Sequence, residues 1–141
     1  DDFTSSMVVL LDSMIINIDR TAKNTNLLNW KNDLWLIDHG ASLYFHHHWP
    51  SWEKHLPRTF PSIQNHVLLE RASQLEEAKE MIQTTINKAK IEDIIDAIPE
   101  DWLADENDDL SVAKKRAAYV TYLNAKLSNI DLLAKEAADA R

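Results

Sequence analysis

The sequence contains no cysteine and only one glycine, Gly40. Without cysteine there is no disulfide and no thiolate chemistry, which excludes an extracellular disulfide scaffold and makes the cytoplasm the default location. With one glycine, the chain has no glycine-rich loop that could cover the phosphates of a nucleotide. No segment resembles a signal peptide, and no apolar run approaches the ~20 residues that cross a bilayer.

Charge and length set further bounds. The chain has 23 acidic and 15 basic residues and a formal net charge of -8, which argues against a nucleic-acid partner and against an anionic membrane surface. Its 141 residues, 45% of them hydrophobic, predict a single domain, 1–141, with a real core. The first residue is not methionine, so we expect a processed chain or a fragment.

Polar residues with the spacing of a kinase catalytic loop stand in the first third of the chain. Asp19 and Asn24 are five positions apart, and Asp38, His39 and Gly40 begin fourteen positions after Asn24. In kinases this pattern supplies the catalytic base, a magnesium ligand and the second metal carboxylate. Mg²⁺ prefers oxygen ligands, so Asn24 and Asp38 would hold it beside the phosphates of ATP. Asp19 would accept the proton of the acceptor hydroxyl, while His39 and Gly40 complete the cofactor-binding turn.

The segment between these motifs predicts a β-hairpin. Two short apolar runs, 27–30 and 34–37, flank Lys31-Asn32-Asp33, a plausible three-residue turn. A hairpin brings its ends together, so Asn24 and Asp38 would meet at one end, where one ion could bind both. The alternative is a solvated loop followed by an ordinary hairpin, because each motif also arises by chance.

Neighbouring side chains are expected to support the site. Arg20 and Lys23 could help to keep Asp19 ionised. His39 could either hold Asp38 by packing or a hydrogen bond, or serve only as a core residue.

On these motifs the chain resembles the bacterial HipA-like kinase family and, more distantly, the type II phosphatidylinositol 4-kinases. The specific similarity precedes residue 50, and the full set of segments is Asp19–Asn24, Leu36–Gly40, Leu43–His47, His66–Leu69, Ile98–Leu103 and Ala137–Arg141. The resemblance implies a mainly α (α+β) kinase-like C-terminal lobe, with one small β-hairpin next to the catalytic loop. It also implies ATP and Mg²⁺ as cofactors, Asp19 as catalytic aspartate, and Asn24 and Asp38 as metal ligands. Thr21 departs from the family, in which many members have histidine there, so position 21 is given no role.

The resemblance implies an incomplete kinase. Only eighteen residues precede Asp19, and they hold no strand with a phosphate-binding lysine followed by a helix with its paired glutamate. We expect the N-terminal nucleotide-gripping lobe to be cut off, disordered or supplied by another chain. The intact parent would transfer the ATP γ-phosphate to a protein Ser or Thr, a small alcohol or a lipid headgroup, and the isolated chain would be inactive. The alternative is a non-catalytic helical interaction module whose uncovered apolar surface binds a partner chain or a second copy.

Three consecutive histidines, His46–His48, raise the possibility of zinc. Consecutive side chains diverge, so at most two of the three could easily meet one ion. We expect residues 41–61 to form an activation-segment-like region, in which the aromatic side chains pack down and the histidines face solvent or the cleft. A histidine metal hydrolase would require bound zinc.

Helical patterns occupy most of the remaining chain, while residues 1–4 are expected to fray. Helices are predicted from an N-cap at Ser5 or Ser6 to Ile18, from the capping box Ser73–Glu76 to Ile86, over Ile91–Ile98, from Ser111 to Leu127, and from about Asn129. Trp102 and Leu103 would anchor a short turn to the core. The acidic run 105–109 is expected to be a solvated loop, and its alternative role in calcium binding lacks the glycine and distal Glu of an EF-hand.

Overall fold

In a computed structural model of the chain, residues 1–56, 59–105 and 110–141 are described. These ranges contain six α-helices, four short 3₁₀ helices and one two-stranded antiparallel sheet. The α-helices are α1 (Asp2–Ile15), α2 (Leu75–Thr85), α3 (Lys88–Asp96), α4 (Glu100–Leu103), α5 (Val112–Ser128) and α6 (Ile130–Ala140), and the strands are β1 (Leu27–Trp30) and β2 (Asp33–Leu36). The 3₁₀ helices are Tyr44–His47, Trp49–His55, Pro61–Asn65 and Leu69–Arg71. The predicted class, mainly α with one small hairpin, is confirmed.

Helix α1 begins earlier than predicted. The carboxylate of Asp1 accepts a hydrogen bond from the backbone N–H of Thr4 at 2.7 Å and so caps the helix. The predicted fraying of residues 1–4 is therefore wrong, and so is capping by Ser5 or Ser6. Both serines are buried inside the helix, where their hydroxyls donate to backbone carbonyls of the preceding turn.

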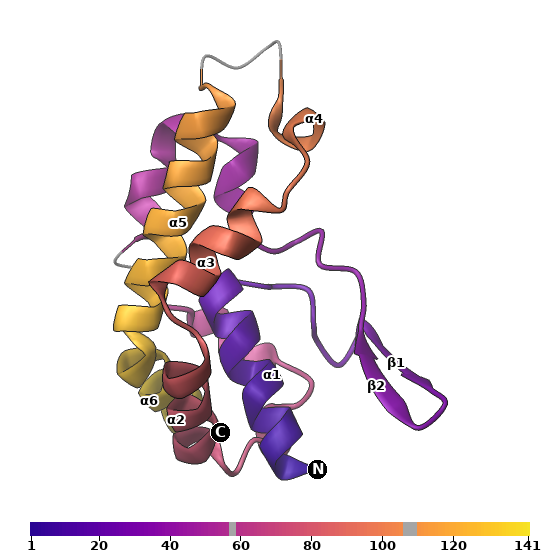
Figure 1. Cartoon of the computed structure of the whole chain (residues 1–141). Coiled ribbons are helices and arrows are strands. Elements are labelled where there is room, and N and C mark those ends of the chain that lie inside the picture. Colours follow the sequence, from indigo (N-terminus) through magenta and orange to yellow (C-terminus); the bar gives the residue numbers. More distant parts are fainter. Residues whose placement is uncertain (57–58, 106–109) are drawn as a thin grey trace.

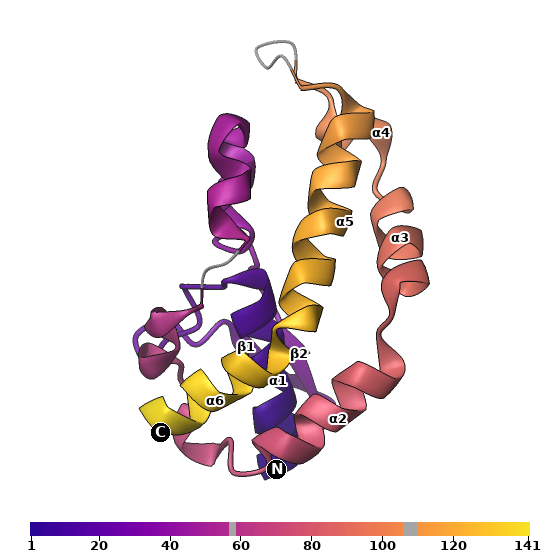
Figure 2. The ribbon, with the colours of Figure 1, turned by 90° about the vertical axis from the view of Figure 1, so that its left-hand side faces the viewer.

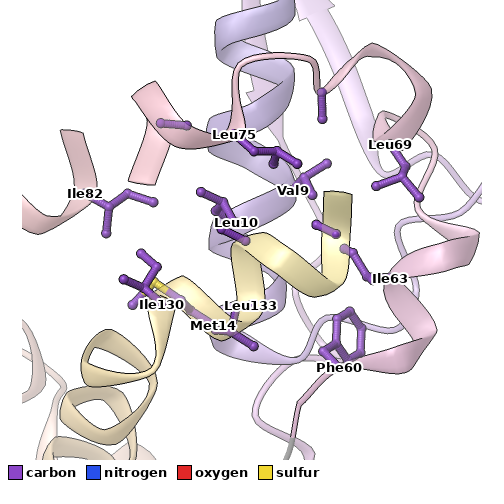
Figure 3. Packing of buried hydrophobic residues seen from close by; sticks show 14 residues of the cluster. Val9, Leu10, Met14, Phe60, Ile63, Leu69, Leu75, Ile82, Ile130 and Leu133 are labelled. Carbon is purple, nitrogen blue, oxygen red and sulfur yellow. The ribbon is translucent and has the colours of Figure 1, made fainter. Parts of the chain in front are cut away.

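The main hydrophobic core lies where α1, α2 and α6 meet (Figure 3). Its large side chains are at most 7% exposed, and those labelled in the figure are Val9, Leu10, Met14, Phe60, Ile63, Leu69, Leu75, Ile82, Ile130 and Leu133. Burying a large apolar side chain contributes about 1.5–3 kcal/mol. This packing holds α1 firmly, and the loop that follows α1 starts from a fixed support.

A second apolar cluster joins the segment after the hairpin to α3 and α5. The rings of Phe45 and Trp49 are buried and meet edge to face, with centroids 5.8 Å apart. Tyr119 and Tyr122 of α5 pack against Phe45. Figure 2 shows α5 with α3 on one side and the 3₁₀ segment on the other. The prediction that aromatic side chains of residues 41–61 pack down is thus confirmed for these two rings.

The hairpin projects from the helical body near α1 (Figure 1). Trp30 pairs with Asp33, so the turn contains two residues, Lys31 and Asn32, and the predicted three-residue turn is wrong. Both turn residues have positive φ, 53° and 68°. Positive φ at both positions is typical of a type I′ turn, whose twist matches that of the two strands.

Apolar side chains lie on the hairpin without being buried. Leu28, Trp30, Leu34 and Trp35 are 46–57% exposed. Such a cluster is uncommon on a monomeric surface and is typical of a contact face. The hairpin therefore shows apolar side chains to solvent next to the loop that holds Asp19.

Helix α2 lacks the predicted capping box. The hydroxyl of Ser73 donates to the carboxylate of Asp2 at 2.9 Å, and α2 starts at Leu75 without a side-chain cap. The hydroxyl of Ser73 does not cap α2, because Asp2 at the start of α1 accepts its hydrogen bond. The box is therefore wrong, although the helix itself is confirmed.

The helices of the second half follow the prediction more closely. Asn87 caps α3 and Ser111 caps α5, the latter by accepting from the backbone N–H of Lys114 at 3.4 Å. Leu103 is buried, but Trp102 is 79% exposed, so only one of the two predicted anchors packs. Most of the acidic run, residues 106–109, lies outside the described residues. Within the described ranges, no helix has the length and apolar character needed to cross a membrane.

Candidate active site

The loop that carries Asp19 begins where α1 ends. The helix was predicted to reach Ile18, but it stops at Ile15 because Ile16 adopts a left-handed conformation with φ 48°. The buried side chain of Asn17 then accepts a hydrogen bond from the backbone N–H of Asp19 at 3.3 Å. This contact fixes the backbone at Asp19.

Two amide side chains hold the carboxylate of Asp19. Its Oδ2 accepts from Nδ2 of Asn24 at 2.8 Å and from Nδ2 of Asn26 at 3.2 Å. The loop between them is closed by Thr21 and Asn24, whose backbone N–H groups donate to each other's carbonyls at 2.9 and 3.2 Å. The five-residue spacing thus brings Asp19 and Asn24 into direct contact.

The hairpin brings its two ends together, as the sequence predicted. The backbone N–H of Ile37 donates to the carbonyl of Asn26 at 3.0 Å, and Nδ2 of Asn26 donates to the carbonyl of Asp38 at 3.3 Å. Asp38 is exposed and has φ 52°, a left-handed conformation that aspartate tolerates better than most residues. The backbone of the turn at Asp38 therefore lies beside the loop of Asp19.

Arg20 does not serve Asp19, contrary to the prediction. Its guanidinium is buried, and its Nε donates to Oδ2 of Asp12 on α1 at 2.5 Å. One terminal nitrogen donates to the carbonyl of Asn26, and the other lies 3.1 Å from Nε2 of His39. Arg20 thus joins α1 to both ends of the hairpin.

Asp12 is the buried carboxylate at the base of the site. Its oxygens also accept from Nδ2 of Asn17 at 3.2 Å and contact Nε2 of His66 at 2.9 Å. Burial alone would raise the pKa of Asp12, but the hydrogen bonds from His66, Arg20 and Asn17 and the charge of Arg20 outweigh burial and lower the pKa below its usual value. Asp12 is therefore ionised at neutral pH.

His39 makes a side-chain contact that fixes the turn, whereas Gly40 is not required there by space. The ring of His39 accepts from Arg20, which helps to fix the turn, and among the described residues no hydrogen bond joins this ring to Asp38. A Cβ added to Gly40 would meet Oδ1 of Asp38 at 3.5 Å, an ordinary contact. Space alone therefore does not require glycine at position 40.

The oxygen atoms of Asn24 and Asp38 fit a magnesium ion in their chemistry. Asn24 uses its Nδ2 for Asp19, which leaves its carbonyl oxygen as an available ligand. Within the described residues, no group of three or more His, Cys, Asp and Glu side chains could hold a metal ion. Mg²⁺ does not need one, because it is usually held by one or two protein oxygens together with phosphates and water.

In the run His46–His48, the rings of His46 and His47 contact each other, and His48 lies apart from them. Nε2 of His46 lies 3.2 Å from Nε2 of His47, and Nδ1 of His46 lies 3.2 Å from the hydroxyl of Tyr119. Burial and the neighbouring His47 lower the pKa of His46. His48 turns away and contacts the hydroxyl of Ser51 at 2.8 Å. As predicted, at most two of the three histidines meet, and His47 and His48 are exposed.

An apolar pocket of about 380 Å³ lies apart from these polar groups. Side chains of α1, α2, α3 and α5 line it, and Leu36 of the hairpin closes one side. Asp19, Asn24 and Asp38 do not belong to it. The apolar pocket is therefore a feature separate from the candidate active site.

Sequence reasoning missed Asp12, Asn17, Asn26 and His66. A polar Asp12 within an apolar helical stripe was a usable signal, because such a residue is buried only with partners. Asn17 and Asn26 flank the catalytic spacing but match no motif. His66 belongs to a segment that carries the family resemblance, but no local pattern connects it to Asp12 or Thr21, which it contacts.

Comparison with known proteins identifies the family of the chain. The family model described as HipA-like kinase matches residues 2–131. Searches of curated proteins and of solved structures gave no match. The match spans the catalytic-loop spacing, the hairpin and most of the helical body. The chain therefore belongs to the HipA-like kinase family.

Proposed function

We propose that this chain carries the catalytic loop of a kinase that transfers the γ-phosphoryl group of ATP to a hydroxyl acceptor. The observation that carries the proposal is the carboxylate of Asp19, held by the amides of Asn24 and Asn26 beside the turn of Asp38. Family membership supports a kinase-like activity in general. The resemblance leaves a protein Ser or Thr, a small alcohol and a lipid headgroup open as acceptor classes.

Asp19 is the proposed base. Both of its amide contacts reach Oδ2, and in the described part of the chain no hydrogen bond is recorded at Oδ1. Oδ1 can face an acceptor hydroxyl and take its proton. At the same time the hydroxyl oxygen of the acceptor bonds to the γ-phosphorus, and the bond between that phosphorus and ADP breaks. The two amides keep the carboxylate in one orientation during the transfer.

Asn24 and Asp38 are the proposed magnesium ligands. Asn24 is oriented by its donation to Asp19, so its carbonyl oxygen points in a fixed direction. The carboxylate of Asp38 is exposed at the end of the hairpin. When bound, Mg²⁺ supplies neutralisation of the negative charge on the phosphate oxygens.

The isolated chain is proposed to turn over little or no ATP. Its one glycine excludes a glycine-rich phosphate loop within these 141 residues. Contacts to the nucleotide must then come from another lobe or chain. The exposed apolar hairpin next to the site is a suitable place for such a contact.

The test uses the full-length protein that contains this chain. Binding of ATP is measured by calorimetry with and without Mg²⁺, and loss of the γ-phosphate is followed in parallel. We expect Asp38→Asn to weaken magnesium-dependent ATP binding and Asp19→Asn to reduce turnover by at least 100-fold while ATP binding persists. Asp33→Asn, an exposed carboxylate on the same hairpin, is the matched control. Unchanged binding and turnover in both site variants would rule out the proposal.

A non-catalytic interaction module is the second candidate. It is favoured by the exposed Trp30 and Trp35, whose large apolar areas suit a protein contact. In this case Asn24→Ala and Asp38→Ala would leave every activity of the parent unchanged, whereas changes on the hairpin would abolish partner binding.

A further inference from the structure

The side chain of Asn26 contacts both Asp19 and the turn at Asp38. Its Nδ2 donates to Oδ2 of Asp19 at 3.2 Å and to the backbone carbonyl of Asp38 at 3.3 Å. One amide nitrogen has two hydrogens, so both contacts can exist together. No sequence motif assigns a role to this position.

The backbone of Asn26 is held from the opposite side. Its carbonyl accepts from the guanidinium of Arg20 and from the backbone N–H of Ile37. Arg20 is in turn fixed by the buried carboxylate of Asp12. The side chain of Asn26 is thus presented by a rigid buried ion pair, and the residue is only 8% exposed.

The backbone conformation favours asparagine at this position. Asn26 has φ 46°, in the left-handed region that asparagine, aspartate and glycine tolerate best. Among these three, only asparagine offers a side-chain N–H donor. An aspartate side chain would place another acceptor against Oδ2 of Asp19 and the carbonyl of Asp38, and glycine has no side chain to contact either.

We propose that Asn26 is a positioning residue that sets the distance between the base, Asp19, and the metal-binding turn at Asp38. This inference rests on the proposed kinase function. Without the amide, Asp19 and the turn would keep their own chemistry but lose their fixed separation. Misplacement of reacting groups by about 1 Å can cost on the order of 100-fold in rate.

The experiment compares Asn26→Asp and Asn26→Gly with wild type in the full-length protein. Asn26→Asp keeps size and backbone preference but removes the donor, while Asn26→Gly keeps only the backbone preference. We expect kcat for γ-phosphate loss to fall on the order of 10- to 100-fold in both variants, with KM for ATP little changed.

Three further proteins make the outcome decisive. Asn29→Asp, the same chemical change at an exposed position of β1, should behave as wild type. Asp19→Asn and Asp38→Asn test the proposed function itself, and if they remain active, that function fails. If they are inactive while both Asn26 variants keep the wild-type kcat, or lose affinity for ATP as a rise in KM with kcat unchanged, the positioning role is overturned. Unfolding of both Asn26 variants, measured by thermal melting, would also overturn it, because Asn26 would then serve stability and not the reaction.

Discussion

The Nε atom of Arg20 lies 2.5 Å from Oδ2 of Asp12, and neither side chain is exposed to solvent. Asp12 belongs to α1, whose apolar face is part of the main core, and Arg20 follows Asp19 in the loop after α1. The ion pair therefore connects the packed helical body to the residues beside Asp19. Removing one partner of such a pair leaves an unpaired buried charge.

Replacing the buried carboxylate should destabilise the chain in a pH-dependent way. At pH 7 we expect Asp12→Asn to lower the free energy of unfolding by about 3–5 kcal/mol. The folded-state pKa of Asp12 lies below 3.8, so its contribution is complete well above pH 3.8 and is lost as the pH falls through the folded-state value. Urea unfolding at several pH values should show the gap between wild type and variant narrowing in acid. A gap that stays constant down to pH 2 would contradict this account.

Arginine at position 20 should not be replaceable by lysine. Arg20→Lys keeps the charge but cannot reach Asp12, the carbonyl of Asn26 and His39 together, because lysine lacks the planar fork. We expect about 2–3 kcal/mol of lost stability. Hydrogen exchange at the N–H of Ile37, which donates to Asn26, should also become faster. Lys23→Arg, an exposed change in the same loop, is the control and should alter stability by less than about 0.5 kcal/mol.

Two buried tyrosines should respond differently to loss of their hydroxyls. Within the described residues, the hydroxyl of Tyr122 is buried and has no hydrogen-bond partner, whereas that of Tyr119 contacts His46 at 3.2 Å. Tyr122→Phe should be neutral or slightly stabilising, while Tyr119→Phe should cost about 0.5–1.5 kcal/mol. Chemical denaturation of both variants under one condition provides the comparison. An equal loss in both would show that Tyr122 has a partner in solution.

The exposed tryptophans should drive association. Trp30 and Trp35 are 57% and 52% exposed, and we expect the purified chain to self-associate or to bind its missing partner through them. The double variant Trp30→Thr and Trp35→Thr keeps β-propensity and should remain monomeric at concentrations where wild type associates. Sedimentation velocity over a concentration series measures this. Trp102→Thr, at an exposed position of α4 far along the chain, is the control and should associate like wild type. If the Trp102→Thr variant no longer associates, the contact surface includes α4 and is not the hairpin alone.

The local patterns of the sequence were sufficient for the helices and the hairpin, whereas the meeting of Asn24 and Asp38 at one ion stays a prediction. The helices and the hairpin depend on interactions between residues close in the chain, such as the capping of α5 by Ser111 and the pairing across a short turn. Predictions failed where a local signal had a distant competitor. Ser73 was predicted to cap α2, but its hydroxyl donates to the carboxylate of Asp2 at the start of α1.

The partners of Arg20 were decided only by the tertiary structure. From the sequence, the neighbouring Asp19 was the obvious partner of Arg20. In the folded chain, however, Asp12 of α1 is buried, and a buried carboxylate without a partner costs more free energy than a half-exposed one. Arg20 therefore pairs with Asp12. His66 reaches the same carboxylate from a segment that no local pattern connects to it. The sequence by itself named the residues that are candidates for phosphoryl-transfer chemistry. Only the packing of α1 against the core decided how they are held, because the free energy of burying a charge depends on neighbours that are distant in sequence.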